Sequence, residues 1–237
     1  AGPGPLDPPS LAWTYHSDFA GEQDVYSGLV GASIVYRPGE LERHTLNVPA
    51  PPGSNLTEEV LTLFLIVDEN LSYYIDENTL TKTNITEGEL QANRLDQGFR
   101  ESNMMHSING RMFGNLLGIE LTVGRNARWH VVRHPSIRWC CIKPLTTGSQ
   151  QSLGNVKNAH APHWHGNVLL WANQRVDIVS FLLIIEYSDL LTLSQISVLP
   201  AQTRSLTMIV DNPGTWIHHC QVLNHRARGM IVQYNAS

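Results

Sequence analysis

The sequence is poor in cysteine, in charge and in long apolar runs, and each shortage excludes a class of protein. Only 3 of its 237 residues are cysteine, an odd number that does not suit a disulfide framework. Charged residues make up 16% and the net charge is -5, with lysine and arginine scattered, so the basic surface that binds nucleic acid is missing. No apolar run approaches the roughly 20 residues that a membrane-spanning helix needs. The sequence therefore predicts no nucleic-acid partner and no membrane span.

Short runs of strand-forming residues are abundant. Hydrophobic residues make up 42% of the chain, and the runs LLGIELTVG, ARWHVV, GNVLLWA, RSLTMIV and GMIVQY are each bounded by turn residues. The unbroken apolar run VLTLFLIV predicts a strand buried on both faces. This pattern predicts an all-β fold, a Greek-key sandwich or barrel. The polar stretch between residues 68 and 103 shows little periodicity of either kind.

Residues 1–50 and 51–237 are predicted to belong to different units. The first 50 residues hold too few strands for a domain and run into a proline-rich break, VPAPPG. We interpret them as the C-terminal part of one β-unit plus a linker, followed by a whole β-domain. Two segments of that domain, about 134–158 and 181–197, are far longer than ordinary loops. We expect both to be inserted segments of translated non-coding sequence and not functional loops, which peptide mapping of the mature protein tests.

Four N-x-S/T sequons favour a secreted, extracellular glycoprotein. They lie at Asn55, Asn70, Asn84 and Asn235. The sequence starts at Ala1, without methionine or a leader, as expected of a mature form or a fragment.

Six of the 11 histidines follow residue 159, in HAPHWH and in HHCQVLNHRARGM. In the second cluster Cys220, His225 and Met230 have C-x4-H-x4-M spacing. A thiolate, an imidazole and a thioether are three of the four ligands of a type 1 (blue) copper site, which takes a second histidine. His160 is the natural candidate for that ligand. The alternative is a buried cysteine that packs as a small hydrophobic residue.

The remaining histidines of these clusters predict a second metal centre. His163 and His165 share one face of an extended strand because side chains alternate with a period of two. His219 adjoins Cys220 and leaves the strand on the opposite face, which makes a bond path between the two centres. The alternative is three histidines on an exposed edge. His218 is expected to be solvent-facing or structural.

Several motifs together resemble the ceruloplasmin and hephaestin group of multicopper oxidases. They are HAPHWHG, DNPGTWIHHC, NHRARGM, DENLSYYIDEN, ESNMMHSINGRMFGN, and WTYHS with SGLVG. The resemblance implies cupredoxin folds, and it implies type 1 copper and, where the ligands suffice, type 2 and type 3 copper. The implied ligands are His160, Cys220, His225 and Met230 for type 1, His163 for type 2, and His165, His219 and His16 for type 3.

The same resemblance implies an oxidase that takes single electrons from ferrous iron or another small reductant and passes them to O2. Glu101 and His106, five apart in ESNMMH, resemble the carboxylate and imidazole that hold substrate iron. A carboxylate beside a histidine suits that ion. The alternative for these two residues is an ordinary loop ion pair.

Three positions depart from the pattern of the family. Gln221 and Asp18 stand where the family has trinuclear ligands, and Asn224 replaces the acid before the type 1 histidine. A first-domain H-x-H-G is absent, so the trinuclear set is incomplete, and a homo-oligomer or a longer native chain would have to complete it. One rival hypothesis is a non-enzymatic cupredoxin module, which binds one copper for electron transfer or storage or has only a structural role. The other is a cofactor-free adhesion or clotting-factor-like domain.

Overall fold

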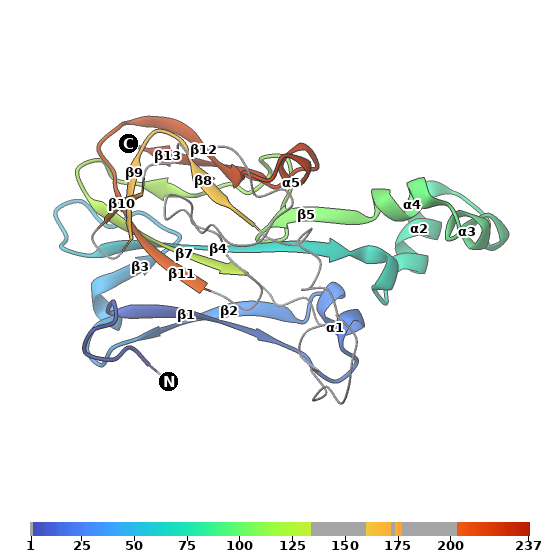
Figure 1. The fold of residues 1–237 in the computed structure, drawn as a ribbon, viewed down its shortest axis with the longest axis horizontal. Coiled ribbons are helices and arrows are strands. Elements are labelled where there is room, and N and C mark those ends of the chain that lie inside the picture. The colour runs from blue at the N-terminus through green and yellow to red at the C-terminus, as the bar shows by residue number, and fades with distance from the viewer. Residues whose placement is uncertain (1, 134–159, 172–173, 177–202) are drawn as a thin grey trace, which may run out of the picture.

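The computed structural model describes residues 2–133, 160–171, 174–176 and 203–237 (Figure 1). The two segments that we interpret as insertions lie outside the described residues, as do Cys140 and Cys141.

Two larger sheets form a sandwich, and a two-stranded hairpin packs beneath them (Figure 1). The larger sheet has the order β10-β9-β11-β7-β4-β3, and β5 also pairs with β4. Its strands are β3 (His44–Leu46), β4 (Thr57–Asp68), β5 (Met104–Ile108), β7 (Asn126–Arg133), β9 (Val168–Trp171), β10 (Gln174–Val176) and β11 (Thr203–Ile209). The second sheet, in the order β6-β13-β12-β8, contains β6 (Glu120–Leu121), β8 (Pro162–Trp164), β12 (Gly214–Cys220) and β13 (Ile231–Ala236). The hairpin pairs β1 (Ser10–His16) with β2 (Val30–Tyr36). The predicted all-β sandwich is confirmed.

The core fills the space between the two larger sheets. Phe64 and Trp129 enter it from the larger sheet, and Val232 and Tyr234 enter it from the second sheet, all of them at most 1% exposed. Along β4, alternate side chains from Val60 are buried while those between them are partly exposed. The expectation that this strand is buried on both faces is therefore correct for one face only.

The polar stretch after β4 forms short helices, which the sequence analysis did not predict. The helices of the described part are α1 (Glu22–Tyr26), η1 (Leu41–Arg43), η2 (Glu69–Leu71), α2 (Ile75–Thr83), α3 (Glu87–Asn93), α4 (Gln97–Ser102) and α5 (Leu223–Ala227). A capping box of Thr86 and Glu89 begins α3, and the Asp96 side chain accepts a hydrogen bond at the start of α4. Within the described residues no helix is long and apolar enough to cross a membrane.

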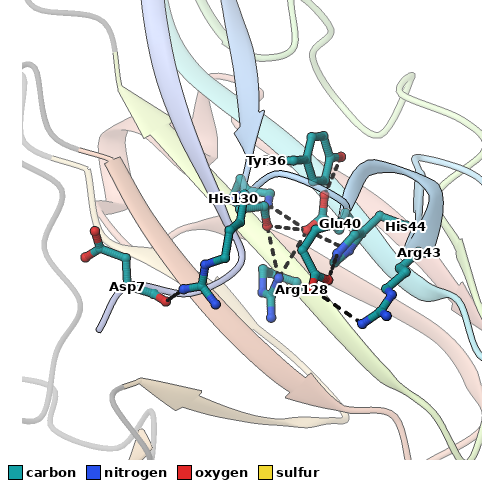
Figure 2. Close-up of polar contacts among 10 residues, drawn as sticks. Asp7, Tyr36, Glu40, Arg43, His44, Arg128 and His130 are labelled. Atoms are coloured by element: carbon teal, nitrogen blue, oxygen red, sulfur yellow. Dashed lines mark hydrogen bonds and ion pairs between the residues drawn. The ribbon is translucent and has the colours of Figure 1, made fainter. Parts of the chain in front are cut away.

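A buried carboxylate on β4 ties the N-terminal strands to the sandwich (Figure 2). Glu59 accepts hydrogen bonds from the Ser10 hydroxyl of β1 and, at 2.7 Å, from the Tyr36 hydroxyl of β2. His44 Nδ1 of β3 lies 3.2 Å from the same carboxylate. The first 50 residues are thus held against β4 through all three of their strands.

Strand β7 completes the surroundings of Glu59. Arg128 Nη1 and His130 Nε2 lie 3.3 Å and 3.4 Å from its Oε1. Burial raises the pKa of Glu59, but hydrogen bonds from His130, Ser10 and Tyr36 outweigh burial and lower the pKa to about 2. The carboxylate is therefore charged at neutral pH. The division of the chain at residue 50 stays a prediction.

Candidate metal centres

Strand β12 and the turn after it place Cys220, His225 and Met230 together. The Cys220 N–H donates to the Met230 carbonyl at 3.1 Å, and the Met230 N–H donates to the His225 carbonyl at 3.0 Å. Helix α5 carries His225 inside this turn. Gly229 has φ +111, and a Cβ there would lie 2.9 Å from Met112 Cβ, so only glycine suits the position. The local fold thus explains the C-x4-H-x4-M spacing.

The first group consists of His160, Cys220 and His225. Cys220 Sγ lies 3.7 Å from His160 Nδ1 and 3.6 Å from His225 Nδ1, and all three residues are buried. A metal about 2.3 Å from sulfur and about 2.0 Å from nitrogen, with trigonal angles, separates those atoms by about 3.7 Å. The observed distances therefore fit one ion of the type 1 class, and the donors are those that such a site takes.

Met230 and Phe64 border this group. Met230 is fully buried and hydrogen-bonded through its backbone to both Cys220 and His225. The Phe64 ring centroid lies 5.6 Å from that of His160. The dry, apolar surroundings suit a blue-copper site, whose potential depends on the hydrophobicity around the sulfur.

The second group consists of His163, His165 and His219, whose candidate ligand atoms all lie within 4.8 Å of one another. Pairing of β8 with β12 puts His163 opposite His219, and the Nε2 atoms of His165 and His219 are 3.1 Å apart. His219 Nδ1 lies 2.9 Å from the Cys220 carbonyl, which can only accept. The His219 Nε2 lone pair therefore points at the group. His163 Nδ1 is buried and has no hydrogen-bond partner among the described residues.

All three imidazoles of the second group are neutral at pH 7. Burial lowers the pKa of His163 to about 4, and charges on His219 and His165 contribute. Burial likewise lowers the pKa of His165 and His219, and the positive charge of Arg226 lowers it further. Neutral imidazole is the form that binds metal.

The two residues predicted to hold a substrate ion have different immediate partners, although the charge of Glu101 still acts on His106. His106 on β5 is 4% exposed, and its ring centroid lies 5.1 Å from that of His225. Burial lowers the pKa of His106 to about 4. Glu101, at the end of α4, forms an ion pair with Arg228, whose Nη1 donates to Oε2 at 2.6 Å. The alternative of an ordinary ion pair therefore describes Glu101 in this structure, although its partner is Arg228.

The ligand role of His16 stays a prediction, and of the two alternatives given for His218 the structural one is correct. His16 ends β1, and in the described part of the chain it belongs to neither histidine group. His218 is 0% exposed, so it is structural and not solvent-facing. Its ring stacks on Trp164 with centroids 4.2 Å apart, and its Nδ1 lies 3.0 Å from the His163 carbonyl.

Two polar residues with clear partners escaped the sequence analysis. Arg228 reaches Glu101 across 127 residues, and Glu59 contacts His130 from a strand 71 positions away. The spacing of these residues gives no local signal. The place of Glu59 directly before the apolar run VLTLFLIV was the one hint that the sequence offered.

Comparisons with known proteins agree with this geometry. A family profile described as multicopper oxidase matches residues 89–237. Human ceruloplasmin is 32% identical over 234 residues, and human hephaestin is 31% identical over 233 residues. The matches cover 99% and 97% of this chain but only 18% and 16% of those proteins, so the chain spans less than a fifth of their length.

Among solved structures, the blue copper oxidase from Nitrosomonas europaea matches with a TM-score of 0.50 and 14% identity, over 97% of this chain and 57% of that one. That likeness supports the cupredoxin type of fold. With the family profile covering more than half of the sequence, the chain belongs to the multicopper oxidase family, whose cofactor is copper.

Proposed function

We propose that this chain accepts single electrons from a small reductant at a type 1 copper held by His160, Cys220 and His225, with Met230 as the weak axial ligand. The observation that carries the proposal is that Cys220 Sγ lies 3.7 Å and 3.6 Å from the Nδ1 atoms of His160 and His225, and that all three residues are buried. Copper bound there supplies the one-electron acceptor. The four residues would be its ligands, and their burial would keep water away from it.

We infer that electrons enter on the side of His106. This imidazole is buried beside His225 and close enough to Arg228 and Glu101 to sense their charges. Ferrous iron is the proposed reductant, because Glu101 and His106 offer a carboxylate and an imidazole beside the first group. Ferrous iron must then displace Arg228 from Glu101. Otherwise the reductant is another small molecule.

Electrons leave towards His219 in this proposal. His219 directly precedes Cys220 in the chain and contacts its carbonyl through Nδ1. The peptide unit between them joins the first group to the second. Reduction of O2 by the second group requires ligands beyond those of this chain, so the proposed oxidase activity belongs to a longer protein or an oligomer.

A non-enzymatic copper module is the second candidate. The observation that favours it is that His16 is not a member of the second group among the described residues. Such a module would bind copper at Cys220 and exchange electrons without consuming O2.

Copper loading tests both candidates. The copper-loaded chain should show the intense blue absorption of a thiolate-bound copper, and Cys220→Ser should abolish the absorption while a surface variant, Gln233→Ala, keeps it. Oxygen uptake with ferrous iron, measured on the oligomer or the longer protein, then separates an oxidase from an electron-transfer module. A colourless copper-loaded wild-type chain would refute the proposed type 1 site.

We further propose an extracellular location. Asn55 and Asn84 are exposed sequon residues and are therefore accessible to glycosylation. Protein from a secreting eukaryotic cell should lose mass on enzymatic deglycosylation. An unchanged mass would contradict the proposed glycoprotein.

A further inference from the structure

We infer that His163, His165 and His219 bind one borderline divalent ion, Cu²⁺ or Zn²⁺, in place of the three-copper cluster that the family resemblance implies. This inference goes beyond the proposed function and does not depend on copper at Cys220. It rests on the donor count, the spacing and the charge of this group.

The donors present suffice for a single ion. Open metal sites typically use three protein ligands and leave a further position for water or substrate. The group offers three imidazoles, and it contains no carboxylate or thiolate among the described residues. Gln221 stands where the family has a further histidine, and His16 is not a member of this group among the described residues. A cluster of three ions would leave each ion with about one protein donor.

The spacing also fits one ion. Two nitrogens, each about 2.0–2.1 Å from the same ion and at angles of about 90–110°, lie roughly 2.9–3.4 Å apart. His165 Nε2 and His219 Nε2 are separated by 3.1 Å, and a His219 lone pair points into the gap. Two lone pairs at this distance repel each other unless a proton or a cation lies between them.

The charge near the group favours a single ion over a cluster. The group contains no carboxylate among the described residues, and helix α5, which packs against β12, carries the positively charged Arg226. Three neutral ligands and one arginine provide no negative charge to offset several divalent cations. One divalent ion with a bound, exchangeable hydroxide places less uncompensated positive charge in the group than several divalent ions would.

The type of donor narrows the identity of the ion. Imidazole nitrogen suits copper and zinc, and Cu²⁺ binds more tightly than Zn²⁺ in the general affinity order of divalent metals. His165 is exposed, so solvent reaches the group. Gln221 directly follows β12, its N–H donates to the Ala161 carbonyl beside β8, and its Oε1 is buried without a hydrogen-bond partner among the described residues. This amide oxygen is a candidate fourth donor.

Copper stoichiometry and electron paramagnetic resonance test the inference on the full chain. After loading with Cu²⁺ and dialysis, the wild-type chain should retain two copper ions, and all of the copper should be visible by paramagnetic resonance. His165→Ala should lower the count to one, since its exposed side chain can be removed without loss of core packing. Gln233→Ala is the surface control and should retain two.

Other counts would overturn the inference. Three or more ions per wild-type chain, a fraction of Cu²⁺ silenced by magnetic coupling, or an unchanged count in His165→Ala each contradict a single ion. A lower count in His16→Ala would show that a further residue contributes. A different outcome contradicts the proposed function alone. If Cys220→Ser retains the wild-type copper count while His165→Ala loses one ion, the single-ion site is supported and the type 1 site is not.

Discussion

Arg228 alters the surface where electrons are proposed to enter. Its Nη1 donates to Glu101 Oε2, and its Nε donates to Asn224 Oδ1 at 2.9 Å, so the guanidinium is held at two points. The Glu101 carboxylate there carries the negative charge that attracts a ferrous ion. Because the guanidinium occupies that carboxylate, it competes directly with any cation.

Replacing Arg228 should therefore strengthen binding of a divalent ion to Glu101. The side chains of the pair are 38% and 52% exposed, and exposed ion pairs contribute only about 0–1 kcal/mol, so Arg228→Ala should tighten binding by about two- to five-fold. Titration with Mn²⁺, a redox-inert stand-in for ferrous iron, measures the change. Arg100→Ala removes a charge from the same helix as Glu101 and should have a smaller effect. Equal affinity in Arg228→Ala and wild type would show that Glu101 does not bind the ion.

At the scale of single residues, the sequence located the metal-binding candidates but not their polar neighbours. Cys220, His225 and Met230 lie within eleven positions of one another, so their spacing reflects one turn of the chain. Glu101 and Arg228 are 127 positions apart and meet only because α4 and the turn after α5 lie side by side in the fold. Only the folded chain reveals such a contact.

At the scale of the elements, Glu59 is the point where five strands meet. Its contacts come from β1, β2 and β3 on one side and from β7 on the other, while β4 carries it. A buried carboxylate is costly unless it is paired and hydrogen-bonded, and here both conditions hold. This charge network is therefore expected to govern the docking of residues 1–50.

Glu59→Gln should destabilise the fold in a pH-dependent way. Near pH 7 the substitution leaves Arg128 without its charged partner and should lower the free energy of unfolding by about 2–4 kcal/mol. The pKa of Glu59 is about 2 in the fold, against an ordinary value of 4.5. A depressed pKa means that the stabilisation is fully present above pH 4.5 and is lost as the pH falls towards 2. The gap between variant and wild type should therefore close over that range.

Urea denaturation at several pH values measures this gap. Glu40→Gln is the matched control, because Glu40 is 24% exposed and lies 3.7 Å from His44 at the edge of the same network. The control should lower the free energy of unfolding by less than about 1 kcal/mol. A gap for Glu59→Gln that stays constant down to pH 2 would be inconsistent with a depressed pKa.

The short helices between β4 and β5 mark a limit of pattern reading at this scale. Helices α2, α3 and α4 are six to nine residues long and mostly exposed, so they need no regular apolar stripe. Their termini did carry signals, since Thr86 with Glu89 forms a capping box. Local capping chemistry identifies such helices better than periodicity does.

At the scale of the whole molecule, the sandwich was predictable because alternating strands bounded by turns have few other ways to bury their apolar face. The pairing of β4 with β7 in parallel and the docking of β1 on β7 were not, since both join segments about 70 or more positions apart. The two histidine groups depend on that larger topology. Strands β8 and β12 pair only after the chain has crossed the sandwich, and their register then sets His163 opposite His219.

Copper should stabilise the whole sandwich because its proposed ligands come from distant segments that assemble only in the folded chain. A ligand that binds the native state alone, at a free concentration of about 100 times its Kd, adds about 2.7 kcal/mol to the free energy of unfolding. For a chain of this length that corresponds to a Tm increase of about 5–10 °C. Differential scanning calorimetry of metal-stripped and copper-loaded chain measures the increase, with Mg²⁺ as the negative control. Cys220→Ser should lose part of the increase, and the double variant Cys220→Ser, His165→Ala should lose nearly all of it, because each group contributes its own binding energy. An equal increase in wild type and the double variant would mean that copper binds elsewhere on the chain.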